Sequence, residues 1–155
     1  MSDLDAMVAL VAAHKVETGL LTRDELASML ASSFHAITAD EGLLISFDQD
    51  ADYTSPNFLW FKTRFDRFVY VDRIITAPHA RGRGVGRRFY EDLFERARDA
   101  GHTRVVCEIN LDPPNPGSVA FHDAMGFVEV GQALLANGKT VSYRELPLGD
   151  KGGLM

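Results

Sequence analysis

The fold is decided by the stretch Arg81-Gly82-Arg83-Gly84-Val85-Gly86-Arg87-Arg88. The run before it, residues 68–77, is apolar and rich in β-branched side chains, which predicts a strand. After it, apolar residues recur at positions 85, 89, 93 and 97, which predicts one face of a helix. The three glycines therefore lie between a strand and the first turn of a helix.

This junction predicts a binding site for a phosphorylated ligand. Glycines leave backbone N–H groups unshielded by side chains, so that a ligand can approach them closely. The first N–H groups of a helix have no intrahelical partner and lie at the positive end of the helix dipole, where phosphate oxygens bind. Four arginines within these eight residues add full positive charge. We interpret the stretch as a pyrophosphate cradle, and the alternative is a solvated turn whose arginines serve solubility.

The spacing of the glycines separates this stretch from two other phosphate-binding motifs. A Walker loop needs Lys-Ser/Thr after its last glycine, whereas Arg87 and Arg88 follow Gly86. The dinucleotide motif is G-x-G-x-x-G, whereas the glycines here give G-x-G-x-G. The pattern that matches is Arg-x-x-Gly-x-Gly, from Arg81 to Gly86. It closely resembles the coenzyme A pyrophosphate loop of the GCN5-related N-acetyltransferases.

Length and composition indicate one globular domain. The chain has 155 residues, of which 46% are hydrophobic and 25% are charged, as is ordinary for a domain with a substantial core. We expect one domain over residues 1–148 and a loose tail over residues 149–155. The sequence shows no apolar run of membrane-spanning length and no signal-peptide pattern. Its single cysteine excludes an internal disulfide and a cysteine-based zinc site. We therefore expect a cytoplasmic protein with no membrane partner and no metal.

Charge is unevenly distributed along the chain, whose net charge is −6. Residues 1–61 carry a net charge of −8, residues 62–104 one of +5 and residues 105–155 one of −3. A nucleic-acid-binding domain usually has a broad basic face and a high isoelectric point, whereas the isoelectric point here is about 5.3. One basic segment in an acidic chain favours a small phosphorylated ligand over a nucleic acid.

The remaining patterns predict an α+β fold, with a mixed sheet and helices on both of its faces. Helices are expected at residues 3–14, from Thr22 onward, after residue 84 and at 116–125, and strands at residues 34–39, 43–48, 68–77, 104–109, 127–135 and 139–147. Residues 22–25 form a capping box, Asn115-Pro116 starts a helix, and Asn137-Gly138 predicts a hairpin turn. This order resembles the GCN5-related acetyltransferase fold over nearly the whole chain.

Residues 50–61 are interpreted as a loop. They begin with a polar stretch that contains a Ser-Pro break and end in a densely aromatic run. We expect this loop to fold over the substrate end of a cleft, with Tyr53, Asn57 and Trp60 in contact with the substrate. The alternative is a surface loop whose aromatic side chains fix it to the core.

Further matches make the family resemblance specific. Residues 74–76 precede Ala77-Pro78, where the family has a strand end whose backbone pairs with the pantetheine arm of the coenzyme. Asn115 matches an asparagine that contacts the coenzyme, and Phe121 lies on the helix that follows. The resemblance implies acetyl-CoA as the acyl donor. It implies coenzyme contacts at Ile74, Ile75, Thr76, Arg81, Gly82, Arg83, Gly84, Val85, Gly86, Arg87, Asn115 and Phe121.

Two departures from the family pattern are visible. The family usually begins with a strand, whereas the helical pattern here starts almost at Met1, so we expect the first strand to be missing. The strand at residues 34–39 then becomes an unpaired sheet edge, which tends to recruit another chain. We expect either a homodimer or cover from the first helix. The second departure is His122, which stands where many members have a tyrosine that acts as general acid.

Attack by an amine needs a base, and two carboxylates are candidates. A free alkylamine has a pKa near 10, so only about one molecule in a thousand is neutral at pH 7, and a base can offset this cost. Glu108 lies in the apolar run 105–109, where a carboxylate has a raised pKa unless it is paired. Its alternative role is an ion pair with Arg73. Asp72 is the second candidate, and its alternative role is an ion pair with a neighbouring arginine.

A departing thiolate also needs a proton donor. The family position implies His122, whose alternative role is a histidine on the surface of a helix. Tyr70, Tyr90 and Tyr143 are further candidates. Cys107 is interpreted as a core residue, because no histidine–carboxylate set accompanies it at readable spacing.

Two functions remain open at this point. The first is an acyltransferase that moves an acetyl group from acetyl-CoA to a primary amine of a small molecule, by direct attack in a ternary complex. The alternative is a sensor or regulatory module that binds coenzyme A and does not catalyse. The histidine at position 122 favours the sensor, whereas Glu108 and the aromatic loop favour the enzyme.

Overall fold

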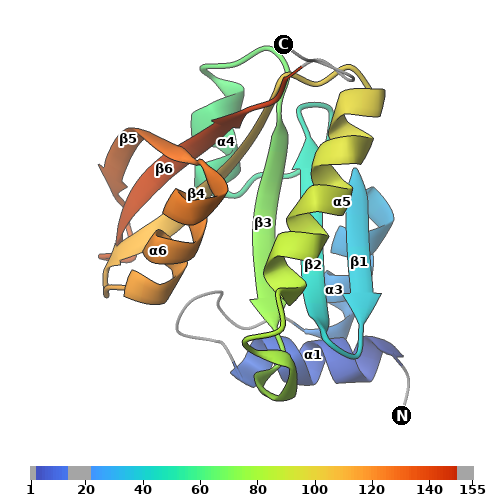
Figure 1. Ribbon diagram of the computed structural model, residues 1–155. Coiled ribbons are helices and arrows are strands. Elements are labelled where there is room, and N and C mark those ends of the chain that lie inside the picture. Colours follow the sequence, from blue (N-terminus) through green and yellow to red (C-terminus); the bar gives the residue numbers. More distant parts are fainter. Residues whose placement is uncertain (1–2, 14–21, 150–155) are drawn as a thin grey trace.

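A mixed sheet of six strands forms the centre of the computed structural model, which describes residues 3–13 and 22–149 (Figure 1). The strands are β1 (His35–Ala39), β2 (Gly42–Asp48), β3 (Val69–Thr76), β4 (Arg104–Asp112), β5 (Val128–Leu134) and β6 (Thr140–Pro147). The helices are α1 (Asp3–Ala13), α3 (Arg23–Ser32), α4 (Pro56–Lys62), α5 (Val85–Asp99) and α6 (Pro116–Met125), and η1 (Pro78–Ala80) is a 3₁₀ turn.

The two central strands separate along their length. The strand order is β1-β2-β3-β4-β6-β5, and every neighbouring pair is antiparallel except β3 and β4. A parallel pair needs a crossover, and α5 provides it. β3 and β4 pair only where Val69 meets Val105 and Tyr70 meets Val106. Beyond these residues the two strands diverge (Figure 1), and the opening between them positions the site.

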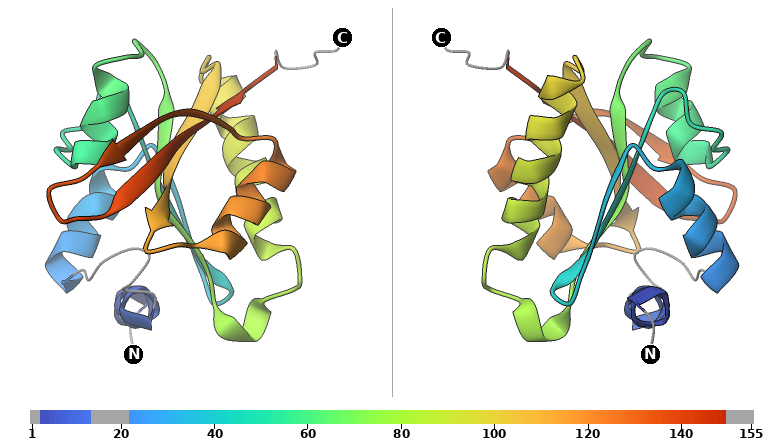
Figure 2. Two further views of the ribbon diagram at one scale, coloured as in Figure 1. Left: turned by 90° about the vertical axis from the view of Figure 1, so that its left-hand side faces the viewer. Right: turned by 90° about the vertical axis from the view of Figure 1, so that its right-hand side faces the viewer.

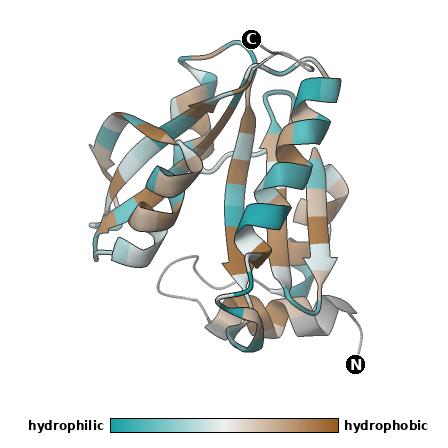
Figure 3. Cartoon of the chain, in the orientation of Figure 1, coloured by the Kyte–Doolittle hydropathy of each residue, from teal (hydrophilic) through white to brown (hydrophobic). Residues whose placement is uncertain are grey.

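Helices cover both faces of the sheet, as the sequence predicts. α5 and α6 lie on one face, α3 and α4 lie on the other, and α1 lies at one end (Figure 2). α5 is amphipathic: hydrophilic residues cover much of its outer surface (Figure 3), and its apolar positions face the sheet. Its buried residues are Val85, Phe89, Tyr90, Leu93, Phe94 and Ala97. The expected α+β fold is confirmed.

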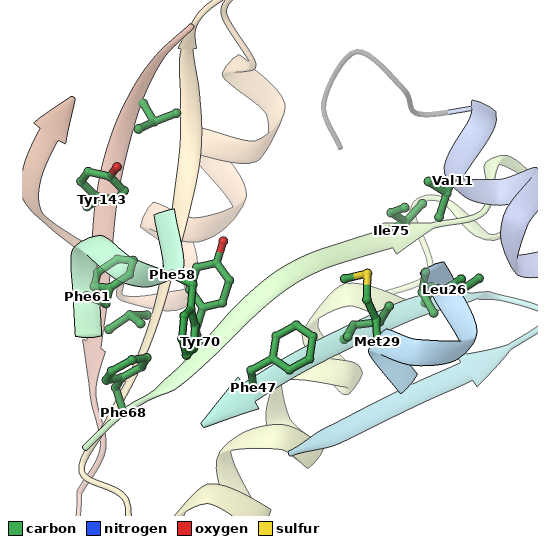
Figure 4. Close-up of a cluster of buried hydrophobic side chains, with 14 of the residues drawn as sticks. Val11, Leu26, Met29, Phe47, Phe58, Phe61, Phe68, Tyr70, Ile75 and Tyr143 are labelled. Atoms are coloured by element: carbon green, nitrogen blue, oxygen red, sulfur yellow. The ribbon is translucent and has the colours of Figure 1, made fainter. Parts of the chain in front are cut away.

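Each face of the sheet has its own hydrophobic core. The core under α5, here called the α5-face core, contains side chains from α5 and from alternate residues of β3 and β4. The core on the opposite face, here called the aromatic core, joins α1, α3 and α4 to the sheet (Figure 4). Its largest buried side chains include Phe47, Phe58, Phe61, Phe68, Tyr70 and Tyr143. Because strand residues alternate between faces, membership of a core shows on which face a strand residue lies.

The structure corrects the expectation of a loop over residues 50–61. Residues 56–62 form helix α4, with Pro56 at its start, a position where proline fits a helix. Phe58 and Phe61 are three residues apart and fully buried, so the dense aromatic run is the apolar face of a short helix. β4 also continues to Asp112, beyond its expected end at residue 109.

The residues that the sequence predicts at helix starts and at the hairpin turn are confirmed in the described part of the chain. The Thr22 side chain accepts a hydrogen bond from the Glu25 N–H, and the Glu25 side chain accepts one from the Thr22 N–H. The Asn115 side chain accepts one from the Ser118 N–H at the start of α6. Gly138 has a φ of 86° in the hairpin between β5 and β6. These contacts end or begin elements where the sequence predicts.

The sheet edge near the N-terminus is β1. Among the described residues no strand lies beyond β1, and residues 3–13 are helical. α1 packs against α3 and β2. The homodimer stays a prediction. No helix in the described part of the chain combines the length and apolar character needed to cross a membrane.

Candidate active site

The divergence of β3 and β4 opens a cleft that connects the two faces of the sheet. A cavity of about 80 Å³, here called the cleft cavity, lies between the strands. Its wall includes Arg73 and Glu108 on one side and Tyr90 on the side of α5. A larger cavity of about 770 Å³ adjoins it on the α5 side. The residues that line both cavities are Ile74, Asn115, Ser118 and His122.

A β-bulge places two neighbouring side chains of β3 on the same face. Consecutive residues 45 and 46 of β2 pair with Arg73 and Val71, so Asp72 is an extra residue in β3. Tyr70 and Ile75 both lie in the aromatic core, although strict alternation would put them on opposite faces. Asp72 shares the face of Tyr70, and Arg73 shares the face of Ile75. Both charged side chains therefore lie on the aromatic-core face, beside the cleft.

Glu108 is a buried carboxylate at this cleft. Val106 of β4 lies in the aromatic core, and Cys107 lies in the α5-face core. Because strand residues alternate between faces, Glu108 lies on the same face as Val106 and Asp72. The Tyr70 hydroxyl donates a hydrogen bond of 2.6 Å to Glu108 Oε1. Burial raises the pKa of Glu108 to about 8, although the hydrogen bond from Tyr70 opposes this rise. Arg73 forms its ion pair with Asp72 instead of Glu108.

Both carboxylate oxygens of Asp72 are occupied. Oδ1 accepts a hydrogen bond from the Tyr53 hydroxyl, and Oδ2 accepts one of 2.6 Å from Nε of Arg73. The side chains of Arg73 and Asp72 are 8% and 5% exposed. Asp72 thus forms the ion pair with a neighbouring arginine that was its alternative role. This geometry favours Glu108 over Asp72 as the base.

His122 and Tyr90 form a hydrogen-bonded pair on the α5 side of the cleft. His122 Nδ1 lies 2.8 Å from the carbonyl oxygen of Ser118, which can only accept, so Nδ1 carries a proton. His122 Nε2 lies 2.7 Å from the Tyr90 hydroxyl and accepts its hydrogen. Burial lowers the pKa of His122 and raises the pKa of Tyr90, which keeps both groups neutral. His122 is 4% exposed and is not a surface histidine.

The glycine loop, residues 81–87, has the backbone of an anion site. Gly82 and Gly84 have φ values of 82° and 73°, which favour glycine. A Cβ at either position would meet no atom within 4 Å, so both face open space. α5 starts at Val85, and no side chain caps it. The N–H groups of its first turn have no intrahelical partner and remain available to an anion.

The larger cavity is lined by every residue expected to contact the coenzyme except Arg83. Its wall consists of Ile74, Ile75, Thr76, Arg81, Gly82, Gly84, Val85, Gly86, Arg87, Asn115 and Phe121, together with Gly117, Ser118 and His122. Gly86 packs closely on Phe121, because a Cβ on Gly86 would lie 2.9 Å from its ring. Within the described chain, β3 beyond Tyr70 does not pair with β4, which leaves this strand edge free for an extended ligand. The wall fits coenzyme A, with the anionic groups at the glycine loop and the arm along β3.

The three residues expected to contact the substrate lie in different places. Tyr53 reaches the edge of the cleft through its hydrogen bond to Asp72. Asn57 accepts a hydrogen bond of 2.9 Å from the Tyr143 hydroxyl, and the Trp60 ring stacks on Tyr143 with 4.1 Å between centroids. None of these three residues is among those that line the two cavities described here. Their contacts resemble the alternative role, in which the aromatic run fixes the segment to the core.

Arg73, Ser118 and Cys107 line the cleft cavity, although no binding or catalytic role there was predicted for them. The position of Ser118 beside His122 could have been predicted from the sequence, because a helix that begins after Asn115 places residues 118 and 122 one turn apart. The bulge that turns the Arg73 side chain to the aromatic-core face cannot be recognised from the neighbouring residues in the sequence. The Cys107 thiol is buried, which raises its pKa, in agreement with a core residue. The described residues contain no group of three or more His, Cys, Asp or Glu side chains that could hold a metal ion.

The sequence of this chain is similar to the sequences of known acetyltransferases. Residues 48–127, which are 80 of the 155 residues, match the sequence model of the acetyltransferase (GNAT) family. Phosphinothricin N-acetyltransferase from Alcaligenes faecalis is 28% identical over 141 residues, which cover 83% of this chain and 67% of that protein. L-amino acid N-acyltransferase MnaT from Escherichia coli (strain K12) is 27% identical over 96 residues, which cover 62% of this chain and 51% of that protein. The matches span about two thirds and about half of these relatives.

Solved structures show the same architecture. The structure of yncA from Salmonella typhimurium, solved with its cofactor acetyl-CoA, has a TM-score of 0.65 to this chain at 16% identity. The likeness covers 99% of this chain and 92% of that chain. At this identity the likeness concerns the fold, and it includes the mixed sheet with its two layers of helices.

Proposed function

The chain belongs to the acetyltransferase (GNAT) family, and we propose that it moves an acetyl group from acetyl-CoA to a primary amine of a small molecule, by direct attack in a ternary complex. The observation that carries this proposal is Glu108, a buried carboxylate whose pKa is raised to about 8 beside a cleft that connects the two faces of the sheet. The glycine loop lies on the α5 side, and Glu108 lies on the aromatic-core face. Donor and acceptor can therefore meet in the cleft from opposite faces.

The curated relatives support a small acceptor that reacts at nitrogen. One is named for phosphinothricin and the other for L-amino acids, and both names specify transfer to nitrogen. For this chain, such an acceptor has to reach the cleft cavity, because that cavity adjoins both Glu108 and the wall of the larger cavity.

The glycine loop and β3 bind and orient the donor. Arg81 and Arg87 line the larger cavity beside the first turn of α5, so their charges add to the helix dipole. Residues 74–76 offer an unpaired strand edge, which holds an extended arm in register. When bound there, acetyl-CoA supplies the acetyl group as a reactive thioester. Backbone N–H groups on that edge are placed to stabilise charge that develops on the acetyl oxygen.

Glu108 takes, directly or through a water, the proton that the ammonium form of the acceptor must lose before its nitrogen can attack. The nitrogen loses its second proton after it has bonded to the acetyl carbon, and that proton goes through solvent to the departing sulfur. Only about one alkylamine molecule in a thousand is neutral at pH 7, which costs roughly 4 kcal/mol. A carboxylate with a pKa of about 8 accepts this proton more readily than an ordinary one. Asp72, whose oxygens bind Tyr53 and Arg73, holds Arg73 in place.

Tyr90 assists the departing sulfur. The carbon–sulfur bond breaks on the α5 side, where the Tyr90 hydroxyl lines the cleft cavity. His122 has a hydrogen bond at each ring nitrogen, so it has no N–H left for the sulfur. Its role in this proposal is to hold the Tyr90 hydroxyl beside the cleft, and as the carbon–sulfur bond breaks the single Tyr90 hydrogen turns from His122 Nε2 to the thiolate. His122 is thus a positioning residue at the family's usual acid position.

The proposal is tested by a screen of small primary amines with acetyl-CoA as donor. Release of free coenzyme A is followed with a thiol reagent, and the acetylated product is identified by mass. We expect steady release with at least one class of amine. A protein that binds coenzyme A in titration calorimetry but releases none with any amine would be the sensor, and the proposal would be wrong.

A further inference from the structure

We propose that Arg73 is the receptor for an oxyanion carried by the acceptor, so that the acceptor is a primary amine with a carboxylate or phosphonate close to its nitrogen, as in an α-amino acid. The inference rests on the proposed function and names the substrate class of that site. It comes from one juxtaposition: an arginine whose buried Nη1 has no hydrogen-bond partner among the described residues and the proposed base, Glu108, line the same small cavity.

The guanidinium of Arg73 is only partly satisfied. Arginine has five N–H donors in a rigid fork. In Arg73, Nε donates to Asp72, whereas Nη1 is buried and has no hydrogen-bond partner among the residues that the structure describes. The side chain is 8% exposed, so bulk water does not replace the missing partner. A buried donor without a partner is costly, and a ligand oxygen would remove that cost.

Glu108 is near Arg73 but does not pair with it. Burial raises the pKa of Glu108 and of Tyr53, and the charge of Arg73 opposes both rises, so the three groups share one electrostatic environment. Glu108 Oε1 accepts from Tyr70, and Arg73 binds Asp72. A single ligand with an amine and an oxyanion can therefore engage both groups, with its amine at Glu108 and its oxyanion at the Arg73 fork.

The fold keeps these two groups close. The bulge at Asp72 turns Arg73 to the face of Glu108. Tyr70 pairs with Val106, so Glu108 and Asp72 each lie two residues past the last paired position. The cavity between the strands, which both side chains line, is only about 80 Å³. Amine and oxyanion must accordingly be near neighbours on the acceptor, as they are in an α-amino acid.

The test compares acceptors that differ only in the oxyanion. The pairs are L-alanine and ethylamine, L-leucine and isoamylamine, and L-phenylalanine and phenethylamine, and 1-aminoethylphosphonate is compared with L-alanine. We expect kcat/KM to be about 10- to 100-fold higher for the acid of the preferred pair, mainly through KM, as for a charge-assisted hydrogen bond. Whether L-alanine or its phosphonate analogue reacts faster identifies the oxyanion.

Variants assign this preference to Arg73. Arg73→Gln should lower kcat/KM for the acid by about 10- to 100-fold more than for the matched amine, because both acceptors lose the effect of the Arg73 charge on Glu108 but only the acid loses an oxyanion partner. Arg73→Lys, which keeps the charge but loses the fork, should lie in between. Arg96→Gln is the matched control, because Arg96 also pairs with an aspartate, on the exposed surface of α5, and it should behave as the wild type. If Arg73→Gln folds poorly, a variant that also carries Asp72→Asn removes both charges of the pair.

A binding measurement separates this inference from the proposed function. Titration calorimetry of the preferred amino acid into protein saturated with coenzyme A should show binding in the wild type and binding about 10- to 100-fold weaker in Arg73→Gln. Equal use of amino acids and matched amines by the wild type overturns the inference and leaves acetyl transfer standing. Binding that depends on Arg73 without transfer to any acceptor overturns the proposed function and supports the oxyanion site.

Discussion

The Tyr70 hydroxyl donates a 2.6 Å hydrogen bond to Glu108 across the point where β3 and β4 separate. Tyr70 lies at the last paired position of the two strands, and Glu108 lies two residues beyond its partner, Val106. The hydrogen bond holds the carboxylate at the cleft and favours its charged form, against the effect of burial. The reactivity of Glu108 therefore depends on Tyr70.

Tyr70→Phe should move the activity profile to higher pH. The hydrogen bond from Tyr70 lowers the pKa of Glu108, so its loss raises that pKa above its present value of about 8. The base works as a carboxylate, so kcat/KM rises as pH increases through this pKa. The midpoint of the rise should shift upward while the rate at high pH changes little. The measurement is kcat/KM from about pH 6 to about pH 10 with one acceptor, whose own titration is then common to both proteins.

Tyr53→Phe is the matched control for this experiment. It also removes one hydroxyl from a buried carboxylate, but that carboxylate is Asp72. Its profile should keep the wild-type midpoint. The account of Glu108 is contradicted if Tyr70→Phe leaves the midpoint unchanged or lowers it.

Tyr90→Phe should lower kcat by about 10²-fold, the usual scale for the loss of a positioned proton donor. His122→Phe should cost less, because it removes only the acceptor that orients Tyr90. Burial lowers the pKa of His122, so the wild-type rate should show no decline as pH rises through about 6.5, the ordinary histidine pKa. If such a decline exists and disappears in His122→Phe, His122 is the proton donor that the family position implies.

Gly84→Val should abolish coenzyme A binding, whereas Gly138→Val should preserve it. Both glycines have positive φ, 73° and 86°, and neither has an atom within 4 Å of a built Cβ. The two substitutions therefore introduce similar backbone strain, but only Gly84 lies in the glycine loop. Gly86 is a poorer choice, because its Cβ would meet the ring of Phe121. Titration calorimetry with coenzyme A makes the comparison, and equal affinities in the two variants would remove the assignment of the loop.

Local signals account for what the sequence predicts correctly. The capping box at Thr22, the helix start at Asn115 and the glycine loop each depend on residues a few positions apart, and the structure has each element there. The family and the α+β fold follow from the same signals, because the loop and the element order together define them. The raised pKa of Glu108 also follows locally, from an apolar strand that surrounds a carboxylate.

The features that the sequence does not predict depend on contacts between distant segments. The bulge at Asp72 is a shift in the pairing of β3 with β2. The sequence of β3 alone therefore does not show on which face of the sheet the Arg73 side chain lies. His122 is buried because α6 places it beside Tyr90 of α5, whose hydroxyl donates a hydrogen bond to it. Helix α4 has seven residues, too few for periodicity to distinguish it from an aromatic loop.

The central claim is that Glu108 takes the proton of the amine, and Glu108→Gln tests it most directly. The amide keeps the shape of the side chain and can still accept from Tyr70, but it cannot take up a proton. With the best acceptor of the screen, kcat/KM should fall by about 10²-fold or more, and the rise near pH 8 should be lost. Coenzyme A affinity, measured by calorimetry on the same preparation, should be unchanged. A Glu108→Gln protein with the wild-type kcat/KM and pH profile would contradict the account.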